Sequence, residues 1–419
     1  MTTSVIQTGF LPGAAQRVHA RAGVGVWLVV LSAMFNLIMC FINTHGWLRV
    51  NATQLAVIEL LIMMVGMLAV RRAVNARVVI ITALVIGYMV GAKLINPGLS
   101  FKFVHDLAII WIFFELGKMG GMEQAQIALR YMVFLILACA LVEFLFPVQY
   151  GQQFNIWQYY VQKGGLSADT VNYSNTTSFV SGSRSGSNAR TYFPSIFGGR
   201  RIASIFLEPV SIGNVAGIIF CWCLATSRNY KNEREIGLYL AVAAFIVLGD
   251  SRFATMFCLV VTLVRFSPFR ESAIITFLMP FFVMIALTLM GSLHEIPGWL
   301  PRITHDDFSG RLLFSGQLLD YWGLSHWFAL SPSPVYTADT GYAYVSNSVG
   351  LIFASVLWFL FSFSRSHSNA QRLMRTCLAV YFVTSLSIGA GIFTIKTASL
   401  LWFLYGATAS EMENRRVKN

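Results

Sequence analysis

The chain is organised around the stretch Arg200-Arg201-Ile202-Ala203-Ser204-Ile205-Phe206-Leu207-Glu208-Pro209-Val210-Ser211-Ile212-Gly213-Asn214. A long polar segment meets an apolar run here, which predicts a membrane boundary. A charge near hydrocarbon costs at least ~2.5–3.5 kcal/mol, so ionisable residues at such a boundary usually face a partner, an aqueous cavity or a ligand. The simpler alternative is that Arg200 and Arg201 anchor a helix end by extending their head groups to the interface.

The composition indicates an integral membrane protein. Of 419 residues, 56% are hydrophobic and only 11% are charged, and the mean hydropathy is +0.64. So few polar residues cannot cover a soluble globule of this size. The apolar segments have the length that a helix needs to cross ~30 Å of hydrocarbon, and they lack the alternation of a β-barrel. We expect an all-α polytopic helical bundle that forms a single membrane domain over residues 1–419.

The hydrophobic pattern predicts about twelve transmembrane helices. We expect no cleavable signal, because the first apolar segment is long enough to remain as a span. The predicted spans cover residues 24–42, 52–70, 78–96, 103–117, 128–147, 202–226, 236–249, 253–266, 273–293, 346–364, 374–391 and 393–409.

Lysine and arginine predict the orientation of the bundle. With these spans, 18 of the 30 basic residues fall on the side that carries both termini and 12 on the other. The positive-inside rule therefore predicts cytoplasmic termini. The same rule accounts for most of the net charge of +12, so we do not expect a nucleic-acid partner. All six cysteines lie in apolar segments and predict neither a disulfide framework nor a metal site.

Two long segments, residues 149–201 and 291–345, are expected on the outer side. The first is rich in Ser, Asn and Gly, which is typical of a flexible tether. Its aromatic part, from Phe154 to Tyr160, suits an interfacial helix instead.

The second outer segment has more side chains that could bind a ligand or take part in catalysis, including three of the seven histidines. The pattern from Ser309 to Leu319 predicts a surface-lying helix that Ser309 caps. The sequence His305-Asp306-Asp307 just before it suits a divalent metal, a base that deprotonates a hydroxyl, or a hydrated capping turn.

Three arginines are expected at helix ends on the outer side: Arg201, Arg252 and Arg311. Guanidinium groups bind phosphate through a planar bidentate fork, and each charge-assisted hydrogen bond contributes ~1.5–3 kcal/mol. If they converge, they would hold an anionic lipid-linked substrate. The alternative for Arg252 is a local pair with Asp250.

Several motifs, taken together, produce a resemblance to a known family. They are Arg201 to Gly213, then Asp250-Ser251-Arg252, then Ser309-Gly310-Arg311, then Asp339-Thr340-Gly341-Tyr342 and the span that begins at Gly350-Leu351. In order and spacing, over residues 195–360, they resemble the bacterial O-antigen ligase and Wzy-type polymerase superfamily. Within it the chain looks most like exopolysaccharide polymerases of the xanthan type.

The resemblance implies a GT-C-like glycosyltransferase of the bacterial inner membrane, multi-pass, with its site on the periplasmic face and no cofactor or metal. Such enzymes join oligosaccharide repeat units carried on undecaprenyl diphosphate, alongside a chain-length regulator and an export complex. By position, Arg201, Arg252 and Arg311 would bind the donor diphosphate, and Arg200, His305, His326 and Tyr342 are further binding candidates.

The catalytic base departs from the family pattern. Asp339 lies where many of the ligases carry a histidine that activates the acceptor hydroxyl. Either this carboxylate removes the proton, or the base lies elsewhere, for instance at Glu208 or His326.

Two other functions remain open from the sequence. A ligase of the same superfamily would transfer the glycan to a lipid acceptor instead of another repeat. A transporter of lipid-linked sugar or polysaccharide would also suit twelve spans, although no matching halves with interrupted helices are evident.

Overall fold

We analysed a computed structural model of the chain. It describes residues 13–165, 191–197, 200–227, 234–294, 308–333, 337, 340–366 and 368–410. Within these ranges the chain is helical and has no β-strand, which confirms the predicted class of a helical membrane protein.

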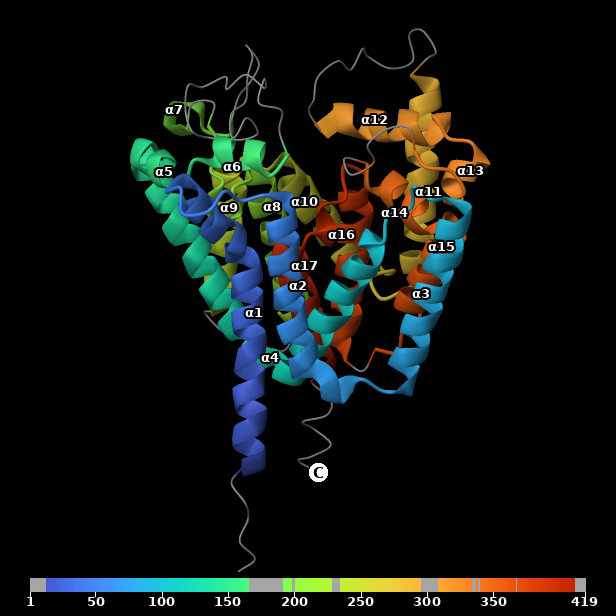
Figure 1. Cartoon of the computed structure of the whole chain (residues 1–419), viewed down its shortest axis with the longest axis horizontal. Coiled ribbons are helices and arrows are strands. Elements are labelled where there is room, and N and C mark those ends of the chain that lie inside the picture. Colours follow the sequence, from blue (N-terminus) through green and yellow to red (C-terminus); the bar gives the residue numbers. More distant parts are fainter. Residues whose placement is uncertain are drawn as a thin grey trace, which may run out of the picture.

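The helices follow one another along the chain as Figure 1 shows. Their bounds are α1 Gly13–Thr44, α2 Ala52–Val70, α3 Ala76–Ile95, α4 Lys102–Leu145, α5 Pro147–Gln153, α6 Ile156–Gln162, α7 Pro194–Phe197, α8 Pro209–Thr226, α9 Arg234–Leu248, α10 Arg252–Phe266, α11 Ala273–Leu293, α12 Phe308–Tyr321, α13 Leu324–Trp327, α14 Gly341–Val349, α15 Leu351–Ser362, α16 Asn369–Leu386 and α17 Ile395–Ala409. Short 3₁₀ turns lie at η1 Arg71–Ala73, η3 Ser204–Phe206 and η4 Gly391–Phe393.

Fewer helices qualify as membrane spans than the sequence predicts. Among the described residues, six helices are long and apolar enough to cross a membrane, or up to seven if the bent pair α14 and α15 counts as one span. The other predicted spans are also helical, but they are shorter or more polar than this test requires; α9, α10 and α17 have 15 residues each. The number twelve therefore stays a prediction.

One predicted span is broken at a glycine, and another glycine marks the break between two predicted spans. Residues 103–117 and 128–147 both fall in α4, whose two parts meet at Gly121, where φ is 66°. Figure 1 shows these parts forming a V at the end of the bundle opposite α12. The predicted span 346–364 is divided at Gly350, where φ is 75°, and α14 and α15 meet at 107°. Glycine adopts such φ values without steric cost.

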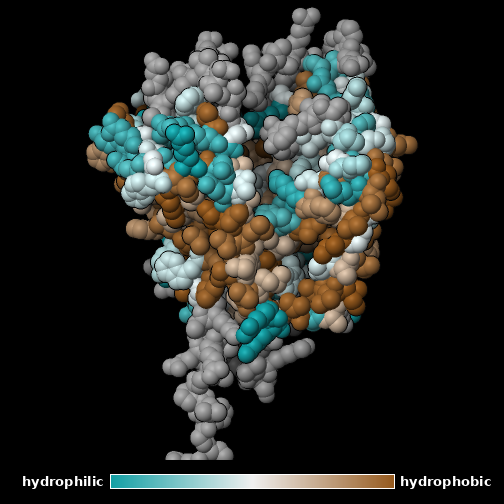
Figure 2. All heavy atoms as spheres, in the orientation of Figure 1, coloured by the Kyte–Doolittle hydropathy of each residue, from teal (hydrophilic) through white to brown (hydrophobic). Residues whose placement is uncertain are grey.

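The burial pattern separates central helices from peripheral ones. Nearly every residue of α8, α16 and α17 is buried. By contrast, the peripheral helices expose large apolar side chains, with Leu94 of α3 81% exposed and Ile352 of α15 68% exposed. Figure 2 shows apolar residues across the middle of the face in view, as expected of a surface that faces lipid.

Helices α4 and α17 pack closely through glycines. A Cβ atom at Gly117 would lie 1.9 Å from Phe403 O, and one at Gly406 would lie 2.0 Å from Phe114 O. Because these neighbours are backbone atoms, a larger side chain has no room at either position.

The helices α5, α6, α7 and α12 lie at one end of the bundle, which we call the polar end (Figure 1). The predicted surface helix is present as α12, but it begins at Phe308, so Ser309 is not its cap. Its residues Leu318 and Leu319 are buried, and Ser315 Oγ donates to Ser387 O at 2.9 Å. The aromatic segment forms α6, in which Tyr159 and Tyr160 are buried.

Candidate functional site

The stretch between Arg201 and Glu208 is held by a buried carboxylate. Glu143 of α4 accepts hydrogen bonds from the backbone of Ala203, at 3.0 and 3.1 Å, and of Ser204, at 2.7 Å. Ser204 Oγ in turn donates to Ile136 O at 2.7 Å. A buried backbone N–H needs a partner, so Glu143 fixes the path of this non-helical segment within the bundle.

Two residues of the same segment have left-handed backbone conformations. The φ angle is 51° at Ser204 and 61° at Leu207. For residues with a Cβ such conformations cost of order 1–3 kcal/mol each, and they persist where surrounding contacts determine them. The bonds to Glu143 and the complete burial of both side chains provide those contacts.

Directly after this segment, Glu208 forms an ion pair with a residue far away in the chain. Its Oε2 lies 2.5 Å from Nζ of Lys396, in the first turn of α17. Tyr160 of α6 donates its hydroxyl to the other carboxylate oxygen of Glu208. Three elements therefore meet at one carboxylate at the start of α8.

These partners keep Glu208 ionised. Burial of the carboxyl acts to raise its pKa, but the ion pair and hydrogen bond with Lys396 and the hydrogen bond from Tyr160 outweigh it, and they lower the pKa from 4.5 to about 2. A carboxylate with so low a pKa accepts protons poorly at neutral pH. The geometry therefore favours Glu208 as a fixed negative charge that holds Lys396, more than as the base.

Lys163 lies beside this group. Its Nζ is 3.8 Å from the ring centroid of Tyr160 and 5.3 Å from that of Tyr159. Burial, followed by the nearby charge of Lys396, lowers the pKa of Lys163 from 10.5 to about 8. We call Tyr160, Lys163, Glu208 and Lys396 the Glu208 cluster.

The structure brings two of the three predicted arginines to one corner of the polar end. Arg201 Nε donates to Gly249 O at 3.0 Å, and Ile202 N donates to Leu248 O at 3.0 Å. Gly249 begins the turn in which Ser251 caps α10, and Arg252 is the first residue of that helix. Arg201 and Arg252 are therefore close in the fold although 50 positions separate them.

Arg311 lies on a different helix, α12, at the same end of the bundle (Figure 1). Helix α12 packs on α11 so closely that a Cβ atom at Gly316 would lie 2.2 Å from Leu287 O.

Of the five remaining predicted site residues, the structure describes three, Tyr342, His326 and Arg200. Tyr342 is buried, with its hydroxyl 3.4 Å from Val383 O, which gives it a structural contact. His326 stacks on Trp322 at 5.8 Å, and its buried Nδ1 has no hydrogen-bond partner in the described part of the chain. Arg200 is half-buried beside the candidate stretch. Asp339 and His305 lie outside the described residues.

Sequence reasoning did not select Tyr160 or Lys163 as site residues, and for Lys396, near an outer helix end, it left open whether the side chain lines the site or only extends to the interface. A signal was present, since Lys163 follows Tyr159 and Tyr160 at helical spacing. Nothing in the sequence, however, indicates that this helix packs against the start of α8. No group of three or more metal-ligating side chains occurs in the portion of the chain that the structure describes.

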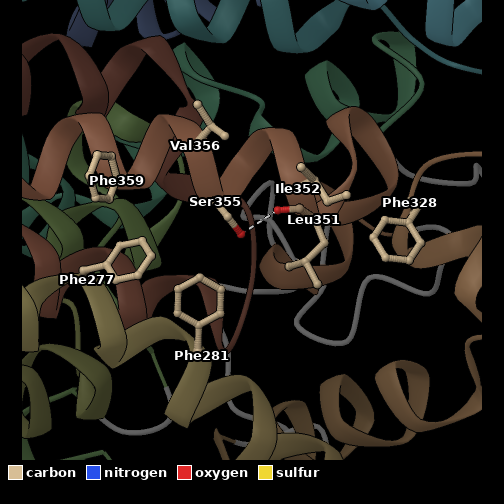
Figure 3. Close-up of a pocket in the computed structure, with 8 residues that line it drawn as sticks. All are labelled: Phe277, Phe281, Phe328, Leu351, Ile352, Ser355, Val356 and Phe359. Carbon is tan, nitrogen blue, oxygen red and sulfur yellow. Dashed lines mark hydrogen bonds between the residues drawn. The ribbon is translucent and has the colours of Figure 1, made fainter.

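An apolar pocket lies elsewhere on the molecule, between α11 and α15 (Figure 3). It has a volume of about 510 Å³ and is lined by Phe277, Phe281, Ile352 and Phe359, among others. Its one polar side chain, Ser355, donates its hydroxyl to Leu351 O at 2.6 Å. This pocket offers hydrocarbon contact and no charge, so it cannot bind a diphosphate.

Comparisons of the sequence with protein-family models and with curated proteins, and of the fold with solved structures, found no match.

Proposed function

We propose that this protein is a membrane glycosyltransferase that polymerises oligosaccharide repeat units linked to undecaprenyl diphosphate, at the periplasmic face of the bacterial inner membrane. The observation that carries the proposal is the corner at which Arg201 contacts the turn before Arg252. The Arg201 guanidinium is held there by Gly249 O, and Arg252 begins α10 three residues after Gly249. Two arginines so placed suit a diphosphate, which arginine binds in bidentate fashion.

The proposed glycosyl transfer needs few groups besides this arginine corner. The anomeric carbon of the donor already carries a good leaving group, so the protein must stabilise the departing diphosphate and deprotonate the acceptor hydroxyl. Arg201 and Arg252 would serve the first purpose, with Arg311 as the third cation from α12. The exposed apolar side chains suit a protein that lies in the bilayer, where the lipid tail of such a donor would also lie.

The experiment is turnover of a chemically defined lipid-diphosphate-linked repeat by the purified protein, without nucleotide. We expect a ladder of products, each one repeat longer than the last. Arg201→Ala, Arg252→Ala and Arg311→Ala should each remove the ladder while the lipid-linked repeat remains. Arg71→Ala, in η1 at the opposite end of the bundle, is the matched control and should keep activity.

Each outcome has a distinct meaning. Normal chain length in all three arginine variants would refute the proposed site. Transfer to lipid A core with no ladder would indicate a ligase. Movement of lipid-linked sugar across vesicles with no new glycosidic bond would indicate a transporter.

A further inference from the structure

A second cluster of titratable side chains lies where α2, α4 and α14 meet. His105 Nδ1 lies 3.4 Å from Asp106 Oδ1, and Asp106 Oδ2 accepts the hydroxyl of Tyr344 at 2.7 Å. His105 Nε2 lies 3.7 Å from Glu59 Oε2. No member of the Glu208 cluster takes part in these three contacts.

The two ring nitrogens of His105 have different surroundings. A hydrogen bond from Nδ1 to Asp106 is compatible with 3.4 Å, whereas 3.7 Å from Nε2 to Glu59 is beyond hydrogen-bond distance. Asp106 is buried and held by Tyr344, while the side chains of His105 and Glu59 are 24% and 29% exposed. A carboxylate that accepts from Nδ1–H fixes the imidazole tautomer whose Nε2 carries a free lone pair.

One member of this cluster, Tyr344, packs near the Glu208 cluster. Its ring lies 5.8 Å from that of Phe393. Phe393 is three residues before Lys396 of the Glu208 cluster. Glu59 also acts electrostatically on Lys163, whose pKa it raises against the larger lowering effects of burial and Lys396.

We propose that His105 is the general base that removes the proton from the acceptor hydroxyl, that Asp106 positions it, and that Glu59 binds a neighbouring hydroxyl of the acceptor sugar. The inference rests on the proposed function. It assigns an acceptor subsite to the α2, α4 and α14 junction, separate from the arginines that would bind the donor.

The step balances without a co-reactant. The proton of the acceptor hydroxyl passes to Nε2 of His105, and the oxygen forms a bond with the anomeric carbon of the donor. The bond from that carbon to the diphosphate breaks, and its electron pair leaves on the diphosphate oxygen. His105 then releases the proton to water.

Further charged groups lie around this cluster. Lys102 of α4 and Lys163 after α6 act electrostatically on Glu59. The ammonium of Lys102 lies 5.0 Å from the Tyr344 ring centroid.

The test uses the full-length protein and the turnover assay above. A positioned general base typically contributes 10²–10⁴-fold, so His105→Gln should lower kcat by about that factor while donor binding is kept. Asp106→Asn should lower kcat with an unchanged KM for the donor. The matched control is His45→Gln, since His45 lies exposed at the end of α1 and bonds Phe41 O through its own ring.

A chemical rescue separates catalysis from folding. Azide attacks without losing a proton, so it should restore reaction of the donor in His105→Gln and yield the glycosyl azide. His105→Asn replaces the glutamine variant if that variant aggregates. Wild-type kcat in the His105 variants, or a low kcat without azide rescue, overturns this inference and leaves the proposed function intact. An inactive wild-type protein overturns both.

Discussion

At the scale of single residues, the Glu208 cluster concentrates charge in a place where water is scarce. Lys396 is 9% exposed, and its ammonium has Glu208 as a partner at 2.5 Å. Removal of one member of a buried ion pair leaves the other charge without compensation, which is costly. The pair therefore ties the start of α8 to the start of α17.

We predict that Glu208→Gln lowers the free energy of unfolding by about 1–3 kcal/mol, because Lys396 then stays buried without its charged partner, while the Glu208 side chain is 29% exposed. Thermal unfolding of the detergent-solubilised protein measures this. The control is Glu271→Gln, which removes a pair with Arg372 at 3.1 Å whose side chains are 31% and 42% exposed. Exposed pairs contribute ~0–1 kcal/mol, so equal losses in the two variants would contradict the prediction.

Lys163 should react as an unusually acidic ammonium. Burial and Lys396 lower its pKa to about 8, so its amine becomes half neutral near that pH, whereas an ordinary lysine needs about pH 10.4. Competitive labelling with an amine-reactive reagent, followed by mass spectrometry, gives the pH of half-maximal reaction. We expect it to move upward in Lys396→Met, where the neighbouring positive charge is gone. An unchanged midpoint in that variant would argue against the proposed cause.

At the scale of elements, the hydrophobic pattern predicted helices well and their breaks poorly. The predicted ranges 52–70 and 273–293 coincide with α2 and α11, because both are continuous apolar runs with polar caps. The break at Gly121 was predicted, since it falls between the expected spans 103–117 and 128–147, but the break at Gly350 was not. The hydrophobic pattern predicts residues 202–208 as part of the same span as α8. Glu143, the carboxylate that holds them out of an α-helix, is about sixty positions away in the sequence.

We predict that Gly406→Ala destabilises the contact between α4 and α17. The added Cβ would lie 2.0 Å from Phe114 O, a backbone atom, so the helices must separate. Overpacking typically costs 1–3 kcal/mol. Gly87→Ala in α3 is the control, because nothing lies within 4 Å of its Cβ position and alanine favours a helix by up to about 1 kcal/mol. Unfolding temperatures of the two variants should move in opposite directions.

At the scale of the whole molecule, the residues of the candidate site gather although they are distant in sequence. The sequence indicated Arg201 and Arg252 as charges at helix ends, and the structure brings them to one corner. It could not indicate that Tyr160, Glu208 and Lys396 meet, because that depends on how α6, α8 and α17 pack. Hydrophobic periodicity predicts which elements form but not which ends become neighbours.

The orientation of the bundle is also a whole-molecule prediction. If the polar end faces outward, a membrane-impermeant maleimide applied to spheroplasts should label Gln152→Cys in α5 and leave Arg72→Cys in η1 unlabelled. Both positions are exposed and lie at opposite ends of the bundle (Figure 1). The parent protein, with its six buried or half-buried cysteines, gives the background. The reverse labelling pattern would place the arginines in the cytoplasm and remove the basis of the proposed function.

The V-shaped helix α4 has a consequence for attempts to change the proposed specificity. One limb carries Asp106, which holds the proposed acceptor base, and the other carries Glu143, which holds the loop beside Arg201. A chimera that replaces only one limb would pack a foreign surface against a native one at Gly121. We therefore expect donor and acceptor preferences to change together when the whole of α4 is exchanged, and seldom when one limb is exchanged alone.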